Sequence, residues 1–234
     1  MARAVELGCD LVEFDVLELT DGTLVVAHSD DLLEVSHGAA SGRVQTKSLS
    51  ALREVAPELP TFDEALELLG GFDSVGIHVD LKGCGLEAAV AQAIRRRGLL
   101  ERSVVSTFHA PSLLRLARVE PELARGLTYP VDRYRLAQRR LLFPVAVATA
   151  SGLRRALPRR IERMLSRVRA SAAMLHYSVV SRAVVDRAHE LGAAVFAWTV
   201  DDEPLLARMV AAGVDGVITN DPRIFVSADY TQDR

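Results

Sequence analysis

Apolar positions along this chain recur with two periods, close to two residues where a strand is expected and close to 3.6 where a helix is expected. Residues 1–8 fit the last turns of a helix that ends at Gly8. Strand-like runs then begin near residues 10, 74, 103, 124, 171, 193 and 214. Helix-like runs lie between them, at residues 49–55, 61–70, 86–97, 111–119, 182–191 and 203–212.

This alternation of strands and helices, joined by short links, predicts an α/β fold with a parallel sheet wrapped by helices. Seven parallel strands are one fewer than the eight that close a (β/α)₈ barrel, the TIM barrel. We therefore expect a TIM (β/α)₈-type barrel whose first strand and part of whose first helix are missing from the sequence. A chain of 234 residues is ordinary for one such barrel, and we predict a single domain over residues 1–234.

Two carboxylates share one face of the first expected strand. Because side chains alternate along a strand, Glu13 and Asp15 point to one side while their apolar neighbours point to the other. A turn at residues 20–23 then sends a second short strand back, which brings His28 near the carboxylates. The pattern indicates a metal ion with a base beside it, but it also fits the wet face of an edge strand with a surface histidine.

The strand that begins near residue 74 ends in polar residues, at the end where barrels of this type hold their functional groups. His78, Asp80 and Lys82 share one of its faces, and we interpret His78, which would lie deeper, as an interior histidine. Glu13, Asp15 and Asp80 offer oxygen ligands, which suit Mg²⁺ or Ca²⁺ better than zinc. Lys82 could bind a phosphoryl oxygen or neutralise the acidic residues, and the sequence leaves both roles open.

The segment 130–170 departs from the regular pattern, because eleven arginines and one acidic residue, Glu162, lie between Arg133 and Arg169. Clustered basic charge attracts phosphate groups and anionic membrane surfaces. These arginines are interleaved with leucine, isoleucine and methionine at helical spacing, however. We therefore interpret the segment as helical, with the arginines on the outer faces of its helices.

Composition limits the class of protein only broadly. The chain is 49% hydrophobic and 25% charged with a net charge of −3, as in soluble globular proteins. No apolar run is long enough to span a bilayer, and the first residues lack the features of a secretory leader, so we predict a cytoplasmic protein without a transmembrane segment. Cys9 and Cys84 are too few for a disulfide framework. We expect no nucleic-acid partner.

Six segments match a known family in order and spacing. They are GCDLVEFDV (8–16), TDGTLVVAH (20–28), LPTFDEAL (59–66), VDLK (79–82), AWTV (197–200) and GVDGVITNDP (213–222). With these segments the chain, from its first residue to about Phe225, resembles the glycerophosphodiester phosphodiesterases. The first two segments together with the last form a specific combination.

The resemblance implies a TIM barrel that hydrolyses small-molecule glycerophosphodiesters to glycerol 3-phosphate and an alcohol, with a divalent cation, Mg²⁺ or Ca²⁺, and two histidines. In that chemistry the metal and a lysine neutralise charge on the phosphoryl oxygens. One histidine activates the attacking hydroxyl and the other protonates the leaving alcohol. The resemblance implies these roles: Glu13, Asp15 and Asp80 as metal ligands, His28 and Lys82 as catalytic residues, and Lys82 and Trp198 as substrate-binding residues.

The chain departs from the family pattern at three places. Asp80 stands where the family has glutamate, and Ser29 stands where the family has an aspartate after the histidine. The family's His-Arg-Gly and Glu-Asn-Thr segments do not occur in this sequence, so the second histidine has no counterpart here. Loss of one of two proton-transfer groups is expected to lower the rate roughly 10²- to 10⁴-fold.

Two hypotheses follow from the resemblance and the departures. In the first, the chain is the greater part of an active phosphodiesterase whose beginning is absent from the sequence. In the second, it is a truncated, catalytically impaired homologue that binds metal or phosphodiester, or acts as a scaffold. With seven strands the barrel of the second hypothesis is open, and its edges would favour self-association because they carry unpaired strand groups.

Overall fold

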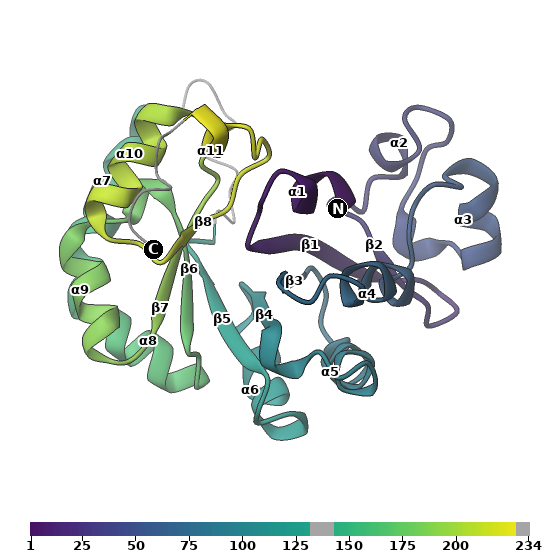
Figure 1. Ribbon diagram of the computed structural model, residues 1–234, viewed down its shortest axis with the longest axis horizontal. Helices are drawn as coiled ribbons and strands as arrows, with labels where there is room; N and C mark the ends of the chain where they lie inside the picture. The colour runs from purple at the N-terminus through teal and green to yellow at the C-terminus, as the bar shows by residue number, and fades with distance from the viewer. Residues whose placement is uncertain (132–142, 228–234) are drawn as a thin grey trace. The chain divides into compact units, whose positions relative to one another are not determined.

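The computed structural model describes residues 1–131 and 143–227. The chain divides into two compact units, which we call unit 1 (Met1–Thr107 and Arg115–Ala124) and unit 2 (Phe108–Leu114 and Arg125–Arg234). The described residues of each unit contribute four strands, and helices lie in the links between successive strands except between β1 and β2, which a turn joins (Figure 1). The single domain expected from the sequence stays a prediction.

The strands follow the parallel order expected from the sequence. Unit 1 holds β1 (Leu11–Glu18), β2 (Leu24–Val26), β3 (Gly76–Leu81) and β4 (Ser103–Thr107). There β2 pairs with β1 in the antiparallel sense, whereas β1, β3 and β4 are parallel neighbours. Unit 2 holds β5 (Ala124–Tyr129), β6 (Ala172–His176), β7 (Ala194–Trp198) and β8 (Gly216–Val217), which pair consecutively in parallel.

The helices fall between the strands. They are α1 (Ala2–Glu6), α2 (Leu32–Val35), α3 (Leu49–Val55), α4 (Phe62–Gly70), α5 (Glu87–Arg96), α6 (Ala110–Val119), α7 (Phe143–Ala156), α8 (Ile161–Val168), α9 (Arg182–Glu190), α10 (Glu203–Ala212) and α11 (Ile224–Ser227). Short 3₁₀ turns lie at Val44–Thr46, Leu100–Arg102, Leu157–Arg159 and Tyr177–Val179. The seven parallel strands predicted from the hydrophobic pattern are all present.

Several element boundaries differ from the prediction. The last strand covers only Gly216–Val217, although residues 214–219 have a strand-like pattern. The helix Leu32–Val35 was not expected, because four residues are too few to show a helical period. It begins at Asp31, whose side chain accepts a hydrogen bond from the backbone N–H of Leu33 at 3.0 Å.

Local sequence signals fix the start of α4. The Thr61 hydroxyl accepts a hydrogen bond from the backbone N–H of Glu64 at 3.2 Å, and the Glu64 carboxylate accepts one from the backbone N–H of Thr61 at 2.7 Å. This is the capping box that the spacing of the two residues predicts. Arg53 also donates two hydrogen bonds to the Glu64 carboxylate, both at 2.8 Å, which ties α3 to α4.

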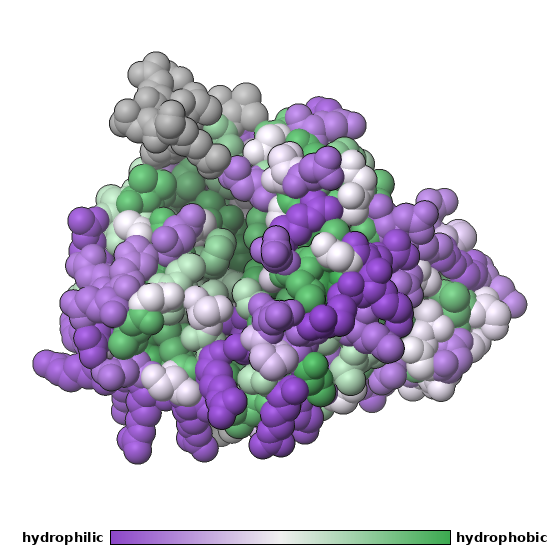
Figure 2. Space-filling model, turned by 60° about the horizontal axis from the view of Figure 1, so that its bottom comes forward, coloured by the Kyte–Doolittle hydropathy of each residue, from purple (hydrophilic) through white to green (hydrophobic). Residues whose placement is uncertain are grey.

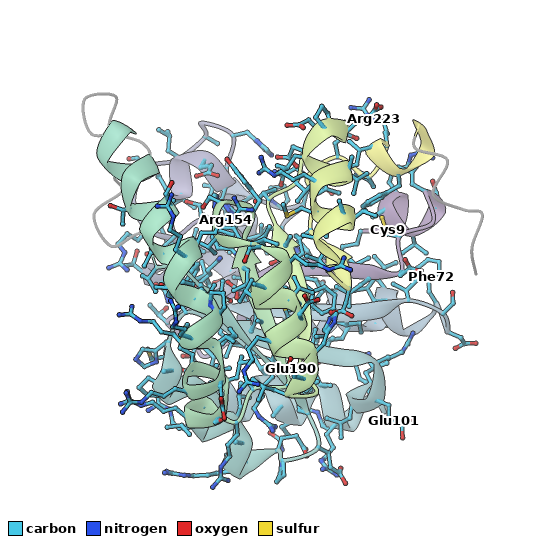
Figure 3. All side chains as sticks on the ribbon, turned by 90° about the vertical axis from the view of Figure 1, so that its left-hand side faces the viewer. Cys9, Phe72, Glu101, Arg154, Glu190 and Arg223 are labelled. Carbon is cyan, nitrogen blue, oxygen red and sulfur yellow. The ribbon has the colours of Figure 1, made fainter. Side chains whose placement is uncertain are left out.

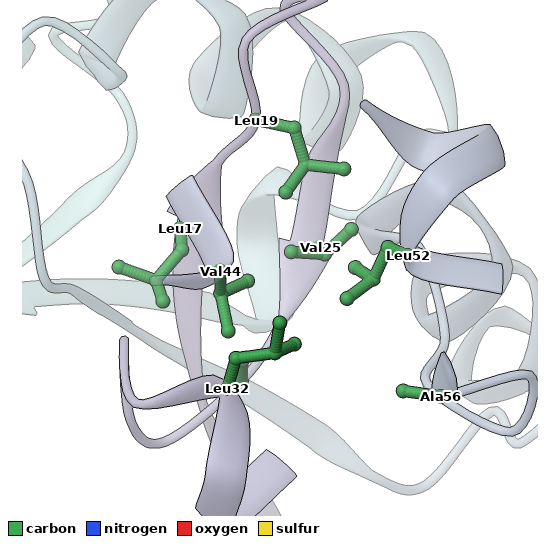
Figure 4. Close-up of a cluster of buried hydrophobic side chains, with 8 residues drawn as sticks. Leu17, Leu19, Val25, Leu32, Val44, Leu52 and Ala56 are labelled. Atoms are coloured by element: carbon green, nitrogen blue, oxygen red, sulfur yellow. The ribbon is translucent and has the colours of Figure 1, made fainter. Parts of the chain in front are cut away.

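A cluster of buried aliphatic side chains holds the β1–β2 hairpin against the helices of unit 1 (Figure 4). Leu17, Val25, Leu32 and Leu52 are all at most 2% exposed and come from β1, β2, α2 and α3. Full burial of such a side chain contributes about 1.5–3 kcal/mol. The hairpin is therefore fixed in place, and with it the residues at its end.

The described part of the arginine-rich segment is helical. In α8 the apolar side chains Ile161, Leu165 and Val168 are buried, whereas Arg163 and Arg167 are exposed. This is the division of faces expected for a helix that covers a core. The arginines between residues 133 and 140 lie outside the described residues.

Polar side chains dominate one face of the molecule. On the face shown in Figure 2, the outermost side chains are largely hydrophilic, and hydrophobic ones lie between and beneath them. Among residues 1–131 and 143–227, no helix is long and apolar enough to cross a membrane. The two cysteines, Cys9 and Cys84, are not joined by a disulfide.

Candidate active site

The register of β1 and β3 brings four of the polar residues to one place in unit 1. The two strands are parallel neighbours in which Glu13 pairs with His78, and Asp15 pairs with Asp80. Because paired residues of adjacent parallel strands project to the same side of the sheet, the three acidic side chains share one face with His78. Asp15 and Asp80 are buried, each 5% exposed.

Lys82 forms an ion pair with each of the two aspartates. Its Nζ atom lies 2.8 Å from Asp15 Oδ1 and 2.8 Å from Asp80 Oδ2. Burial works against the charge on Lys82, but the carboxylates of Asp80 and Asp15 outweigh that effect and raise the pKa of the lysine. Lys82 is therefore a cation held in the middle of an acidic cluster.

The carboxylates of Glu13 and Asp15 are harder to ionise than those of free amino acids. Burial, followed by the nearby charges of Asp15 and Asp80, raises the pKa of Glu13 to about 8. Burial also raises the pKa of Asp15, although the charge of Lys82 acts in the opposite direction. The cluster thus has more negative charge than one ammonium group neutralises.

A buried chain of hydrogen bonds from His78 through Ser106 holds the Asp80 carboxylate in place. The Ser106 hydroxyl on β4 donates to Asp80 Oδ1 at 2.5 Å, and His78 Nε2 lies 2.8 Å from the same hydroxyl oxygen. Since the hydroxyl hydrogen is used on Asp80, His78 Nε2 must carry the hydrogen that completes the chain. Burial lowers the pKa of His78 to about 4, so the ring is neutral near pH 7.

Sequence reasoning identified His78 as an interior residue but missed Ser106. His78 is 2% exposed and Ser106 is 1% exposed, so both belong to the interior of unit 1. The strand Ser103–Thr107 carries three hydroxyl side chains, Ser103, Ser106 and Thr107, and nothing in the sequence singled out Ser106 among them. Which carboxylate it would meet depends on the pairing of β4 with β3, and one sequence does not reveal that pairing.

His28 lies beside this cluster, at the end of β2. The backbone N–H of Ala27 donates to the carbonyl oxygen of Asp15 at 3.0 Å, which places the next residue close to the carboxylates. The His28 side chain is 83% exposed, and its Nδ1 lies 3.8 Å from Glu34 Oε1. The Ser29 hydroxyl accepts from the backbone N–H of Asp31, so it is used in the following turn.

Trp198 belongs to unit 2, where it is half-buried at the end of β7. Its indole N–H donates to the carbonyl oxygen of Met174 at 2.9 Å. The ring makes edge-to-face contacts with Phe108 and His176, with centroids 5.8 and 4.9 Å away. These contacts fix the indole in an aromatic cluster of unit 2, and its role in substrate binding stays a prediction.

The donor chemistry of the acidic cluster suits a hard divalent cation. Three carboxylates from two neighbouring strands supply oxygen ligands only. The pKa of Glu13 is raised first by burial and then by the charges of Asp15 and Asp80, and a bound cation would favour its ionised form. In residues 1–131 and 143–227, however, no three histidine, cysteine, aspartate or glutamate side chains already converge as a set of metal ligands. Glu13, Asp15 and Asp80 are the residues that could hold such an ion.

Comparisons with known proteins identify the family of the chain. The sequence model of the glycerophosphoryl diester phosphodiesterase family matches residues 1–224. A glycerophosphodiester phosphodiesterase from Caldanaerobacter subterraneus subsp. tengcongensis is 28% identical over 243 residues, which cover 96% of this chain and 88% of that protein.

Solved structures show the same fold. A glycerophosphodiester phosphodiesterase from Thermotoga maritima superposes with a TM-score of 0.71 at 22% identity, over 96% of this chain and 87% of that one. A phosphodiesterase from Oleispira antarctica, solved in complex with its product sn-glycerol-3-phosphate, gives 0.69 at 22% identity, over 95% and 85% of the two chains. The α/β fold of TIM-barrel type predicted from the sequence is thus confirmed. The chain belongs to the glycerophosphoryl diester phosphodiesterase family, a family of phosphoric diester hydrolases.

Proposed function

We propose that this protein hydrolyses glycerophosphodiesters to glycerol 3-phosphate and an alcohol, with Mg²⁺ or Ca²⁺ held by Glu13, Asp15 and Asp80. The observation that carries the proposal is the convergence of Asp15 and Asp80 on the Lys82 ammonium group. The two aspartates are paired near the C-terminal end of β3 and of the part of β1 that pairs with β3. Functional residues of TIM-barrel enzymes gather at this end of the strands. The Oleispira antarctica relative, which has bound sn-glycerol-3-phosphate, supports the choice of substrate class.

The charge balance of the site supports a cation requirement. With Asp15 and Asp80 ionised, the single ammonium of Lys82 leaves the cluster negative, and ionised Glu13 would make it more so. A phosphodiester is itself an anion, and the cluster alone would repel it. A bound divalent cation would neutralise the charge that remains on the three carboxylates and Lys82, and it would polarise a phosphoryl oxygen as a Lewis acid.

The side chains have separate roles in the proposed reaction. Lys82 neutralises charge that develops on the phosphoryl oxygens. Ser106 and His78 keep the Asp80 carboxylate in one orientation. His28 is exposed enough to exchange protons with solvent and lies beside Asp15, so we assign it one of the two proton transfers.

The proposed chemistry has two steps. The glycerol hydroxyl next to the phosphate attacks phosphorus, the P–O bond to the alcohol breaks, and a cyclic phosphodiester forms. The attacking hydroxyl loses a proton in this step and the leaving alcohol gains one. Water then opens the ring to give glycerol 3-phosphate. His28 either accepts the first proton or delivers the second.

An assay of glycerol 3-phosphate release tests the proposal. Purified protein is incubated with glycerophosphocholine and Mg²⁺ or Ca²⁺, and the same reaction is run with a chelator. We expect release that requires the metal and that falls roughly 10²- to 10⁴-fold in His28→Asn. His37→Asn is the matched control, since His37 is an exposed histidine whose positive φ of 51° asparagine also accepts. Equal activity of the two variants would remove His28 from the mechanism.

A second candidate function is binding without turnover. It is favoured by the exposure of His28 and by the use of the Ser29 hydroxyl in a turn, which leave the imidazole loosely oriented. In that case calorimetry would detect binding of glycerol 3-phosphate to the metal-loaded protein, while the assay would show no product above the buffer control.

A further inference from the structure

One stretch of unit 2 is rich in exposed arginines that form no ion pair with a carboxylate of the described residues. All seven arginines between residues 154 and 169 are exposed. Within the described residues, none of them forms an ion pair with a carboxylate, and Glu162, the one acid in this stretch, pairs with Arg187 on α9 at 2.5 Å. The stretch is therefore strongly positive, although the whole chain has a net charge of −3.

Most arginines elsewhere in the described chain form ion pairs. Ten of them form ion pairs with aspartate or glutamate. Arg43, for example, pairs with Asp30 at 2.6 Å, and Arg115 pairs with Glu87 at 3.0 Å. Ten of the fourteen described arginines outside residues 154–169 are thus ion-paired, whereas the described residues show no ion pair for the seven arginines within that stretch.

The arginines of α8 point to one side of the helix. Arg163 and Arg167 are four residues apart and Arg160 lies one turn before them, so the three share a face. The opposite face is anchored by Ile161, Leu165 and Val168, which are buried. A rigid helix therefore presents the positive face outward, and no acidic partner within the described chain covers it.

The positive surface extends to the end of α7. A cavity of about 370 Å³ is lined by Arg154 and Arg155 of α7, together with Ser151, Pro158, Ser181 and Ala183. Arg154 is held in place by a hydrogen bond from its Nε to the carbonyl oxygen of Val180 at 2.8 Å. Figure 3 shows the molecule from the side that carries the helices of unit 2, with Arg154 labelled. The cavity offers guanidinium and hydroxyl donors, as a phosphate group requires.

We propose that residues 154–169 form a docking surface for an anionic lipid membrane. The surface covers the end of α7 and the outer face of α8, which is more extended than one bound phosphate needs. Each arginine near an anionic bilayer strengthens binding roughly fivefold, so several acting together give a measurable peripheral attachment. The cavity beside Arg154 and Arg155 would take the phosphate of one lipid head group.

A membrane fits these observations better than a nucleic acid does. Single-stranded nucleic acid is bound by basic residues interleaved with aromatic ones, on which bases stack. The stretch 154–169 contains no aromatic residue. A membrane also meets only one face of a protein, so the net negative charge of the remaining chain does not oppose it.

Vesicle flotation tests the proposal. Wild-type protein is mixed at low salt with vesicles of equimolar phosphatidylglycerol and phosphatidylcholine, or of phosphatidylcholine alone. We expect binding only to the anionic vesicles, and its loss at roughly 0.5 M salt. Arg163→Glu/Arg167→Glu should lower the partition coefficient roughly 25-fold or more, because two favourable contacts become repulsive.

The matched control is Arg3→Glu/Arg96→Glu, which makes the same change of net charge at exposed sites of unit 1. It should bind the anionic vesicles within about twofold of wild type. Equal losses in the two double variants, or no flotation of wild type, would overturn the proposal. Tighter binding to an oligonucleotide than to the vesicles would overturn it in favour of a nucleic-acid partner. Thermal unfolding of each variant verifies that the protein is folded.

Discussion

Charged side chains are arranged in opposite ways in the two units. In unit 1, Asp15, Asp80 and Lys82 are gathered on neighbouring strands, and each lies 2.8 Å from a group of opposite charge. In unit 2, the arginines of residues 154–169 are exposed, and no carboxylate of the described chain pairs with them. Buried charges must be compensated within the fold, whereas exposed like charges cost little and stay available to a partner. The first arrangement suits catalysis and the second suits docking.

Replacement of Lys82 should have the largest effect on stability. Lys82→Met removes the ammonium group that lies between Asp15 and Asp80 and leaves two buried carboxylates together. We expect a loss of about 3 kcal/mol in the free energy of unfolding in the presence of a chelator, measured by urea denaturation. The only other lysine, Lys47, gives the control Lys47→Met, which should change stability by less than about 0.5 kcal/mol. Similar losses in both variants would contradict the central role of Lys82.

A pH titration of stability tests whether the acidic cluster of unit 1 raises the pKa of Glu13. The pKa of Glu13 is about 8 in the folded protein and lies near 4.5 when unfolded, so the folded state binds this proton more tightly. In a chelator, wild-type stability should therefore fall as the pH rises from about 4.5 to 8 and level off above it. Glu13→Gln should lack this fall and be more stable than wild type above pH 8, by on the order of 2 kcal/mol. The same slope in both proteins would contradict the raised pKa.

Charge reversal on the arginine surface should have the smallest effect on folding. Arg163→Glu/Arg167→Glu changes exposed side chains without ion-pair partners among the described residues, so its free energy of unfolding should lie within about 0.5 kcal/mol of wild type. Chemical denaturation measures this difference. A loss of 2 kcal/mol or more would show that these arginines stabilise the fold, and would weaken the contrast between the two units.

Features encoded locally could be predicted from the sequence. The capping box of Thr61 and Glu64 depends on residues three apart, and the shared face of Glu13 and Asp15 depends only on the alternation of a strand. The pattern of residues suggested a base at His28 and left two roles open for Lys82, and the resemblance to the family added their catalytic roles and the role of Trp198. These roles are still predictions.

Features that depend on contacts between distant segments could not be predicted. The hydrogen bond from Ser106 to Asp80 joins residues 26 positions apart and requires the pairing of β4 with β3. The two ion pairs of Lys82 likewise follow from the register between β1 and β3, whereas the sequence left open whether this lysine contacts acids or substrate. Among residues 1–131 and 143–227, the lack of carboxylate partners for the arginines of α7 and α8 is also a tertiary property, because exposure alone does not exclude an ion pair.

Calorimetric titration of Mg²⁺ and Ca²⁺ into the purified protein tests most directly whether the acidic cluster of unit 1 is a cation site. We predict saturable binding of at least one of the two ions by wild type, and no detectable binding by Glu13→Ala or Asp80→Ala, with both variants shown to be folded by circular dichroism. Binding of unchanged affinity in both variants, or none by wild type, would contradict the account.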